Sequence, residues 1–425
     1  MAKALIISRY FPPLSSAGAS IRLVKFLKYL SNWDWKFVVF TQDLQQTVVR
    51  EQVLSSFLLA ELPEDIVVER VAAPFASNQP TSSENGSGCI FRKILGDSSL
   101  AWGIVVFWNG LRELHKSKFD LVFGTTPPFT NALVMMLLGW VGRKPFVLDL
   151  KDDWVGSPTF KQKGIFRQKS EMFLESLIVR SASAVITVTA QSYRLYMERY
   201  AHLGHARKFH LIPNGCDLDE YDDLGHRERR IASRRFLILS AAWGFRKDYR
   251  DIRPFLLGLD AFLRRRTDTR DKVDVVLLGD SLSAEYDELL IDLNLDKVIQ
   301  RAGAVKRNIL IEWLWKADLF LLVQPVHNTT AISGTLYEYW ATGKAPVLLI
   351  SEVGASSALV EENQIGKHFH FDQVAEIAEY IEKIFDAYES GQPIWIEREG
   401  IQKFDRKALA RHMEVIWQKA LSAKS

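Results

Sequence analysis

The sequence predicts an α/β protein made of two similar domains, each with a mostly parallel sheet covered by helices on both faces. Short apolar strands alternate with helical patterns through both halves of the chain, which is typical of parallel sheets. The chain has 425 residues, too many for one ordinary domain, and 48% of them are hydrophobic, as two large buried cores require. We therefore expect two Rossmann-like domains that face each other across a cleft.

Runs rich in β-branched and aromatic residues mark the expected strands. In the first half these are Leu5–Ser8, Phe37–Phe40, Ile66–Val71, Leu121–Phe123, Phe146–Leu150, Ala184–Val188 and Leu211–Pro213. In the second half they are Phe236–Ser240, Val273–Gly279, Val298–Ala302, Leu319–Val323 and Pro346–Ile350. Apolar residues at helical spacing lie between them, for example in Phe255–Arg265, Leu310–Lys316 and Leu336–Thr342.

A run that is dense in charge and poor in apolar residues separates the two halves. It predicts a linker at residues 217–235 between an N-terminal domain, residues 1–216, and a C-terminal domain, residues 236–400. Residues 401–425 form a last helix, which could cross back to the first domain.

Net charge, cysteine content and the length of apolar runs limit the kinds of protein that this chain can be. A net charge of +3 is too small for the basic stripe of a nucleic-acid-binding protein, although a locally basic face over anionic lipid stays possible. Cys89 and Cys216 lie far apart and form no metal-binding or disulfide pattern, which favours the cytoplasm. The N-terminus does not resemble a signal peptide, and the longest apolar run, Ala132–Val141, is too short to span a bilayer.

One helical segment of the first half has two interpretations. Residues 98–114 contain Trp102, Trp108 and several aliphatic residues, with Arg112 and Lys116 nearby. The segment could be an ordinary core helix, or it could contact an apolar acceptor or a membrane surface.

The segment from Ser333 to Lys344 contains the strongest local signal. Ser333 is a good N-cap, and Gly334 lets a ligand approach the free N–H groups of a helix start, where phosphates bind. Glu338, about one turn further, could then meet a ribose hydroxyl pair of the same nucleotide. The alternative is an ordinary capped helix with a solvent-facing Glu338.

This segment resembles the donor-binding helix of retaining glycosyltransferases of family 4, whose pattern is Glu, seven residues, Glu, and then Ala-x-Gly-Lys-Pro. Glu338, Ala341, Gly343 and Lys344 match this pattern, and Pro346 matches in a displaced position. Thr330 takes the place of the family's first glutamate, which contacts the sugar. Ser333 or Thr335 could supply a hydroxyl group there instead.

Further matches follow in the family's order along nearly the whole chain. Ser8–Pro13 with Gly18 and Arg22 resembles the opening strand and the glycine-bearing loop, which lies beside donor phosphates and acceptor. Residues 120–128 resemble the family's "YDVV…TSPP" segment, residues 146–154 its "VLDIRDLW" segment, and residues 212–217 its "IPNGVD" segment. Residues 277–280 resemble a further strand end of the family, and residues 317–320 resemble a strand start.

Carboxylates gather at the end of one predicted strand of the first half. Asp149, Asp152 and Asp153 lie where an open α/β sheet binds ligands, and they are candidates to orient an acceptor hydroxyl or to take its proton. The alternative is a loop salt-bridged through Lys151. The resemblance places Arg22 and Trp154 on this acceptor side.

In the second half, Arg246 and Lys247 occupy the place of the family's basic phosphate clamp. A cation there would offset the charge on the departing diphosphate. Residues 302–305 resemble the turn whose backbone faces the base, which makes Val305 a donor-side candidate. With Gly18, Ser333, Gly334, Thr335 and Glu338, these residues form the expected donor site.

The sequence lacks the phosphate-binding turns GxGxxG and GxxxxGK[ST]. Asp217-Leu218-Asp219 is formally a DxD metal signature, but it lies in a linker after a turn, and no metal-ligand cluster is visible. His327 could border the donor sugar, or it could be structural. We therefore expect no cofactor and no metal requirement.

The resemblance implies the GT-B fold and a retaining, metal-independent glycosyltransferase that uses a nucleotide-sugar donor. It implies a saccharide or lipid-linked acceptor in surface glycan assembly, at the inner face of the plasma membrane. Two alternatives stay open: a nucleotide-sugar epimerase on a similar fold, and a non-catalytic partner protein, which Thr330 makes credible.

Overall fold

The computed structural model describes residues 2–13, 19–43, 58–72, 100–116, 119–156, 160, 163–222, 235–242, 244–279 and 282–423. The chain divides into two compact units, which we describe separately. The first comprises Met1–Pro213 and Arg406–Ser425, and the second comprises Asn214–Asp405. The candidate residue Gly18 and most of the expected linker, residues 223–234, lie outside the described residues.

A seven-stranded parallel sheet forms the centre of the first unit, in the order β3-β2-β1-β4-β5-β6-β7. Its strands are β1 (Ala2–Ile7), β2 (Trp35–Gln42), β3 (Val67–Val71), β4 (Leu121–Thr126), β5 (Phe146–Leu150), β6 (Ala184–Thr187) and β7 (Phe209–Leu211). Ile6 pairs with Val39 of β2 on one side and with Phe123 of β4 on the other. The order of strands therefore reverses between β1 and β4, and such switch points are where open parallel sheets bind ligands.

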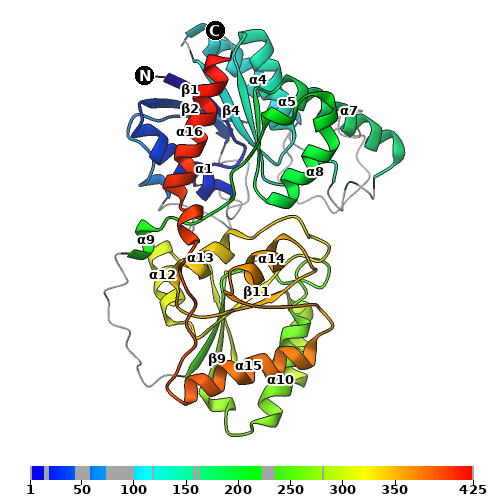
Figure 1. The fold of residues 1–425 in the computed structure, drawn as a ribbon, viewed down its shortest axis with the longest axis vertical. Helices are drawn as coiled ribbons and strands as arrows, with labels where there is room; N and C mark the ends of the chain where they lie inside the picture. Colours follow the sequence, from blue (N-terminus) through cyan, green and yellow to red (C-terminus); the bar gives the residue numbers. More distant parts are fainter. Residues whose placement is uncertain are drawn as a thin grey trace. The chain divides into compact units, whose positions relative to one another are not determined.

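Helices cover both faces of this sheet (Figure 1). They are α1 (Ala19–Ser31), α4 (Leu100–Lys116), α5 (Thr130–Gly142), α7 (Ile165–Ser181), α8 (Ala190–Tyr200) and α16 (Arg406–Ser422). Alternate residues of β1 supply two cores: Ala4 and Ile6 face α1 and α16, whereas Leu5 and Ile7 face α4, α5, α7 and α8. Short 3-10 turns at Ala201–Leu203 and Ala206–Lys208 precede β7.

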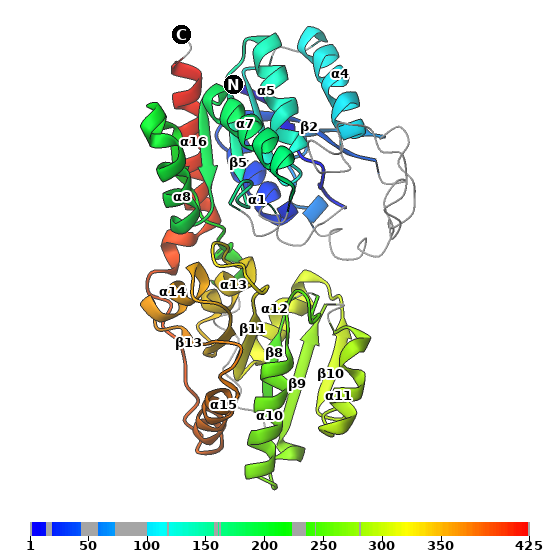
Figure 2. The same ribbon diagram turned by 90° about the vertical axis from the view of Figure 1, so that its right-hand side faces the viewer.

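The second unit repeats this plan with a six-stranded parallel sheet in the order β10-β9-β8-β11-β12-β13 (Figure 2). Its strands are β8 (Phe236–Ser240), β9 (Val273–Leu278), β10 (Ile299–Gly303), β11 (Leu319–Val323), β12 (Val347–Ile350) and β13 (Gly366–Phe369). The switch point lies between β8 and β11, where Leu319 pairs with Ile238. β13 is a strand that the sequence analysis missed, because its four residues do not form an apolar run.

The helices of this unit surround the sheet and enclose a second large core. They are α9 (Asp219–Asp222), α10 (Arg253–Arg265), α11 (Asp287–Asp292), α12 (Arg307–Lys316), α13 (Gly334–Thr342), α14 (Ala355–Glu362) and α15 (Val374–Glu389). Single 3-10 turns lie at Arg270–Lys272, Ala284–Tyr286 and Ile401–Phe404. The expectation of two α/β units with parallel sheets is confirmed.

The last helix of the chain, α16, is part of the first unit and packs along α1 (Figure 1). Trp417 anchors it, with its ring centroid 4.8 Å from that of Trp35 and 4.9 Å from that of Phe123. Its side chain is fully buried. The C-terminus of the chain thus completes the core of its N-terminal half.

Replacing Trp417 with alanine removes this anchor, and we expect the first unit to lose about 3–5 kcal/mol of unfolding free energy. Urea unfolding followed by near-ultraviolet circular dichroism measures the loss. Val415→Ala, at an exposed position of the same helix, is the control and should change stability by less than about 0.5 kcal/mol. Equal effects of both variants would contradict the anchoring role.

Candidate functional site

The helix α13 presents its first N–H groups beside the switch point of the second sheet. It begins at Gly334, one residue after Ser333, and ends where Gly343 adopts a left-handed conformation with φ of 61°. Among the residues that the structure describes, a Cβ added to Gly334 would meet no atom within 4 Å, so this end of the helix is open there. The first N–H groups of a helix have no intrahelical acceptor, and they are therefore available to an anion.

Ser333, Gly334 and Thr335 are each half-buried at this helix start. Ser333 makes no side-chain capping hydrogen bond, so its expected role as an N-cap is limited to its extended backbone conformation. The three residues keep the positions that the donor-site hypothesis requires.

Tyr339 fixes α13 against the ends of two neighbouring strands. Its hydroxyl accepts a hydrogen bond from the backbone N–H of Ala241, at 2.8 Å, and lies 3.2 Å from the carbonyl oxygen of Leu321, to which it donates. Its ring stacks on Phe320 with centroids 4.2 Å apart and an interplanar angle of 6°. The helix start is therefore held in place by β8 and β11.

Glu338 is buried and ion-paired. Its Oε1 accepts a hydrogen bond from Nη1 of Arg307 at 2.9 Å, and only 7% of the residue is exposed. Its Oε2 has no hydrogen-bond partner among the described residues. The interpretation of Glu338 as a solvent-facing residue is therefore excluded, while one carboxylate oxygen is left to receive a ligand.

Arg307, the first residue of α12, links Glu338 to α9. It donates to Oε2 of Glu220 from Nη2 at 2.5 Å and from Nε at 3.1 Å, and it also contacts the hydroxyl of Tyr221 at 3.2 Å. Burial acts to lower the pKa of Arg307, but Glu338, Tyr221 and Glu220 together raise it well above its usual value. Arg307 is thus a permanent cation between two carboxylates.

The sequence analysis did not identify Arg307. It follows the predicted base-facing turn by two residues, and this position is the signal that could have found it. Val305 itself is half-buried and packs against the core of the second unit. Residues 305–307 therefore connect this turn to Glu338, because Arg307 donates a hydrogen bond to the Glu338 carboxylate.

The loop after β8 contains the candidate cations. Arg246 is exposed and forms an ion pair with Asp248 at 3.3 Å, and Lys247 is exposed as well. Arg250 is half-buried, and its Nε has no hydrogen-bond partner among the residues that the structure describes. Burial lowers the pKa of Arg250, and Tyr249, whose ring centroid lies 5.5 Å from the guanidinium, opposes this shift. The Nε of Arg250 is therefore a donor that an anion could engage, whereas Arg246 is already paired with Asp248.

The loops after β8 and β11 are tied together. The N–H of Val326 donates to the carbonyl oxygen of Tyr249 at 2.7 Å. The second loop is also held to the start of α14, because the N–H of Ala355 donates to the carbonyl of Thr329 at 2.8 Å. A Cβ on Gly354 would come within 2.2 Å of that carbonyl oxygen, so glycine is required for this approach. Thr330 lies in this fixed loop.

In the first unit, Asp149 at the end of β5 is buried and bound by Arg22 of α1. Nη2 and Nε of Arg22 donate to its Oδ1 and Oδ2 at 3.1 and 3.2 Å. The same guanidinium donates to the carbonyl oxygens of Ile212 and Pro213 at 2.9 and 2.5 Å. This geometry favours an anchoring role for Asp149 and Arg22.

The three carboxylates after β5 differ in exposure. Asp153 is buried, and its Oδ1 accepts from the N–H of Gly156 at 3.1 Å and from Arg199 at 3.4 Å. Asp152 is exposed, whereas Asp149 and Asp153 are buried. Burial lowers the pKa of the neighbouring Lys151 to about 8.

Trp154 is a core residue of the first unit. Its ring stacks on Phe129 with centroids 4.5 Å apart, and its Nε1 donates to Oε2 of Glu171 at 3.1 Å. It is 2% exposed, so it shapes the acceptor-side loop from within. A substrate therefore does not reach its ring in this conformation.

The buried ion pair of Glu338 can be tested by removing its cation. Arg307→Met removes the cation that pairs with the buried carboxylate of Glu338, and we expect the second unit to lose about 3–5 kcal/mol of unfolding free energy. Arg301→Met, which removes an exposed guanidinium paired with Asp287, should cost at most about 1 kcal/mol. Chemical denaturation monitored by circular dichroism compares the two. A small loss in Arg307→Met would mean that the carboxylates do not depend on this cation.

Comparisons with known proteins identify a domain family and the fold. Residues 17–215 match the family model described as glycosyl transferase 4-like domain. A search by sequence among curated proteins found no match. Many solved structures have a similar fold. The three described next cover 98% to 100% of this chain.

The structure of Anabaena Alr3699/HepE in complex with UDP-glucose has a TM-score of 0.65 at 17% sequence identity and covers 98% of this chain and 100% of its own. Trehalose-6-phosphate synthase OtsA has a TM-score of 0.63 at 12% identity and covers 100% and 97%. A putative UDP-N-acetylglucosamine 2-epimerase from Listeria monocytogenes has a TM-score of 0.57 at 13% identity and covers 98% and 96%. At these identities the likeness shows the fold, which is GT-B.

Proposed function

We propose that this chain is a glycosyltransferase that moves a sugar from a nucleoside diphosphate sugar to a saccharide or lipid-linked acceptor, because its first half matches a glycosyl transferase 4-like domain and its fold is GT-B. The observation that carries the proposal is the pairing of Glu338 with an open helix start at the switch point of the second sheet. The resemblance to family 4 enzymes supports retention of configuration at the anomeric carbon.

The donor would lie against the second unit. Oε2 of Glu338 accepts hydrogen bonds from the ribose hydroxyls, while Arg307 holds the other carboxylate oxygen. The diphosphate lies at the N–H groups that begin at Gly334, where the helix dipole favours negative charge. Val305, close to Arg307 in sequence, flanks the base. The first nucleotide to test is UDP, with which the Anabaena protein was solved.

Charge on the departing diphosphate is the main electrostatic demand of the reaction. Arg250 and the start of α13 offset it in this proposal, and this is why we propose a reaction without a metal ion. The sequence favoured Arg246 and Lys247 for this role, but both are exposed, and the half-buried position of Arg250 makes it the better candidate.

The acceptor would meet the first unit at the loop after β5. Asp152 is placed to orient its hydroxyl group or to take its proton, since Asp149 is occupied by Arg22. Water must be kept from the bound donor during the reaction, because it would otherwise hydrolyse the donor.

The biological setting that we propose is the assembly of surface glycans in the cytoplasm, with peripheral contact at the inner face of the plasma membrane. Among the described residues, no helix is long and apolar enough to cross a membrane. Exposed Ile104 and Trp108 on α4 support contact with a lipid surface.

Incubation with a panel of nucleotide sugars tests the function. Slow hydrolysis or transfer to added acceptors is the expected result. Interconversion of the donor without an acceptor would identify an epimerase, and binding without turnover would identify a non-catalytic protein.

Glu338 should determine donor affinity. Glu338→Ala removes the acceptor of the ribose hydroxyls, and we expect the dissociation constant for UDP to rise roughly 10- to 100-fold. The fold should persist, because Glu220 still pairs with Arg307. Calorimetry measures the affinity and a thermal melt checks the fold. Glu312→Ala, at an exposed position of α12, is the matched control; unchanged UDP binding in Glu338→Ala would remove Glu338 from the site.

Arg250 should recognise the phosphates. We expect Arg250→Met to weaken UDP binding by roughly tenfold or more, because a charge-assisted hydrogen bond is lost, and to leave uridine binding unchanged. Arg246→Met is the control, since Arg246 is exposed and paired with Asp248. If Arg246→Met weakened UDP binding more than Arg250→Met did, the phosphate-binding cation would be Arg246, as the sequence suggested.

A further inference from the structure

The outward face of α7 carries large apolar side chains. Ile165, Phe166, Met172 and Phe173 are all exposed, Ile165 by 73% and Phe166 by 78%. At 3.6 residues per turn, these four side chains fall within about 120° of arc on the helix. Solitary exposed apolar residues are ordinary, but four on one stripe of a helix indicate a contact surface.

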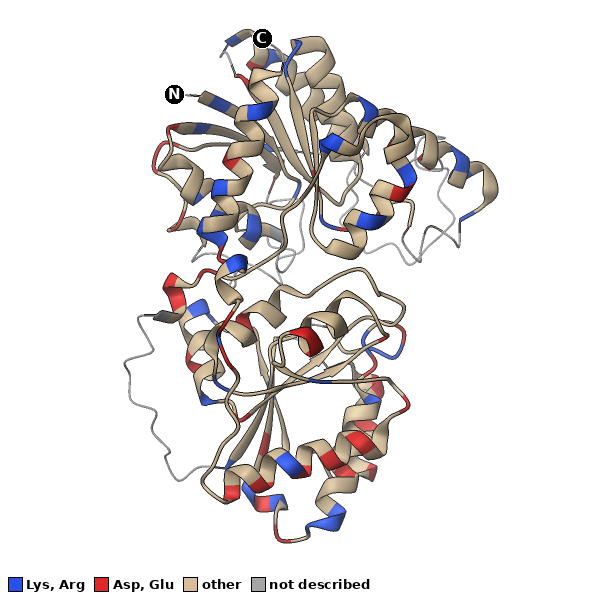
Figure 3. Cartoon of the chain, in the orientation of Figure 1, with Lys and Arg blue, Asp and Glu red and all other residues tan. Residues whose placement is uncertain are grey.

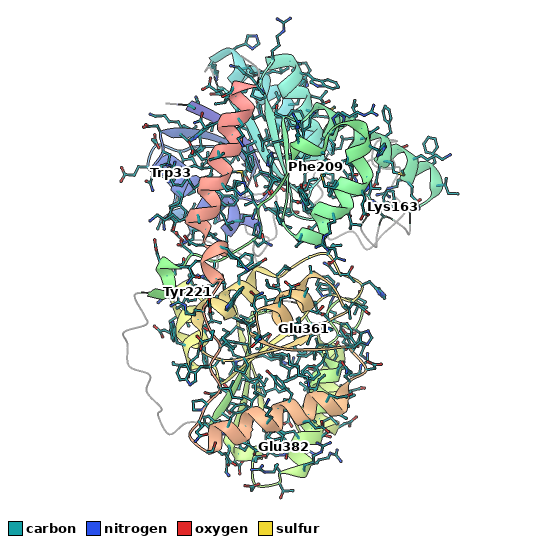
Figure 4. The ribbon with its side chains drawn as sticks, viewed as in Figure 1. Trp33, Lys163, Phe209, Tyr221, Glu361 and Glu382 are labelled. Atoms are coloured by element: carbon teal, nitrogen blue, oxygen red, sulfur yellow. The ribbon has the colours of Figure 1, made fainter. Side chains whose placement is uncertain are left out.

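The charged residues of α7 are sorted by sign. Lys169 and Arg180 are exposed within the same arc, whereas Glu171 and Glu175 are buried on the opposite side. Nζ of Lys163, just before the helix (labelled in Figure 4), donates to Oε2 of Glu171 at 2.7 Å. The outward face of α7 is therefore apolar and basic, without an acidic residue.

The buried acids also fix the helix in place. Glu175 accepts hydrogen bonds from Arg199 at 2.7 Å and from the hydroxyl of Tyr200 at 2.6 Å, and Glu171 is bonded to Trp154. Burial raises the pKa of Glu175, and the charge of Arg199 opposes this shift. The apolar stripe is thus presented by a helix that is anchored to the core.

The helix α4 shows the same pattern. Its exposed residues are Ile104, Trp108, Arg112, His115 and Lys116, and none of them is acidic. The stripe begins with two apolar residues and ends in basic ones. The sequence of this helix is compatible with a core helix and with a membrane-contact helix.

The helix α5 lies between them, since it packs against both α4 and α7 on one face of the sheet. It exposes Trp140, Val141 and Arg143 beside its C-terminal end. The three helices form one layer whose exposed residues are apolar, basic or neutral. By contrast, acidic residues recur along α15 of the second unit, where Figure 3 shows repeated red bands.

We propose that the outer face of the α4–α5–α7 layer docks the protein on a bilayer that contains anionic phospholipid. Phe166, Phe173 and Trp108 enter the boundary between head groups and acyl chains, and Lys169, Arg112 and their basic neighbours contact lipid phosphates. This docking surface is a more specific form of the membrane contact proposed above and rests on that proposal. It does not depend on the transfer of a sugar.

The absence of exposed acids on this layer favours the anionic surface over a second copy of the chain. Two such layers facing each other would bring Lys169, Arg180 and Arg112 of both copies together without carboxylates to compensate. An anionic bilayer supplies the missing negative charge and accepts aromatic side chains.

Co-sedimentation of the full chain with vesicles tests the proposal. We expect binding to vesicles of phosphatidylglycerol and phosphatidylcholine, weaker binding at high salt, and little binding to pure phosphatidylcholine. Phe166→Ser/Phe173→Ser should reduce the binding constant roughly tenfold or more, because two aromatic side chains stay in water. Ile104→Ser/Trp108→Ser should reduce it as well.

The matched control is Ile291→Ser/Val353→Ser, which removes two exposed apolar side chains of the second unit and should leave vesicle binding unchanged. Equal loss in this control, equal binding to both kinds of vesicle, or no binding would overturn the proposal. Loss of self-association in Phe166→Ser/Phe173→Ser, measured by sedimentation velocity, with unchanged vesicle binding would assign the face to a second copy. UDP binding by the same variants separates this result from the transferase, because it should not change.

Discussion

A guanidinium held between two carboxylates is the interaction on which the proposed donor site of the second unit depends. Arg307 binds Glu338 on one side and Glu220 on the other, and all three come from different helices. Isolated charges at this depth would be unstable, so each depends on the others. Because Arg307 engages only one oxygen of Glu338, the second stays available, and a structural ion pair also orients the carboxylate for a ligand.

The start of α13 depends on this arrangement and on the sheet. Tyr339, one residue beyond Glu338, is hydrogen-bonded to Ala241 after β8 and to Leu321 in β11, so the helix cannot turn or slide without breaking those bonds. A prearranged set of donors costs little reorganisation when an anion arrives. The phosphate and ribose contacts of the proposed donor site are thus fixed by one short helix, which starts at Gly334.

The first unit also contains a buried arginine–carboxylate pair, but this pair connects secondary-structure elements. Arg22 satisfies both oxygens of Asp149 and two backbone carbonyls at residues 212 and 213, so it ties α1, β5 and the end of the unit together. This leaves Asp152 as the exposed carboxylate of the loop. Buried carboxylates of α7 anchor that helix in the same way, with the apolar stripe of Phe166 facing outward.

The alternation of strands and helices determined the fold class from the sequence alone, because each parallel strand needs an apolar run and each crossover a helix. The sequence also predicted the helix that starts at Gly334 and the place of Glu338 on it, since helix capping and residue spacing depend on neighbouring residues alone. Tertiary structure alone decided that Arg307 pairs with Glu338, that Arg250 is half-buried whereas Arg246 is exposed, and that Trp154 belongs to the core. Such partners lie far apart in sequence, and only the packing of separate elements brings their charges together or removes them from water.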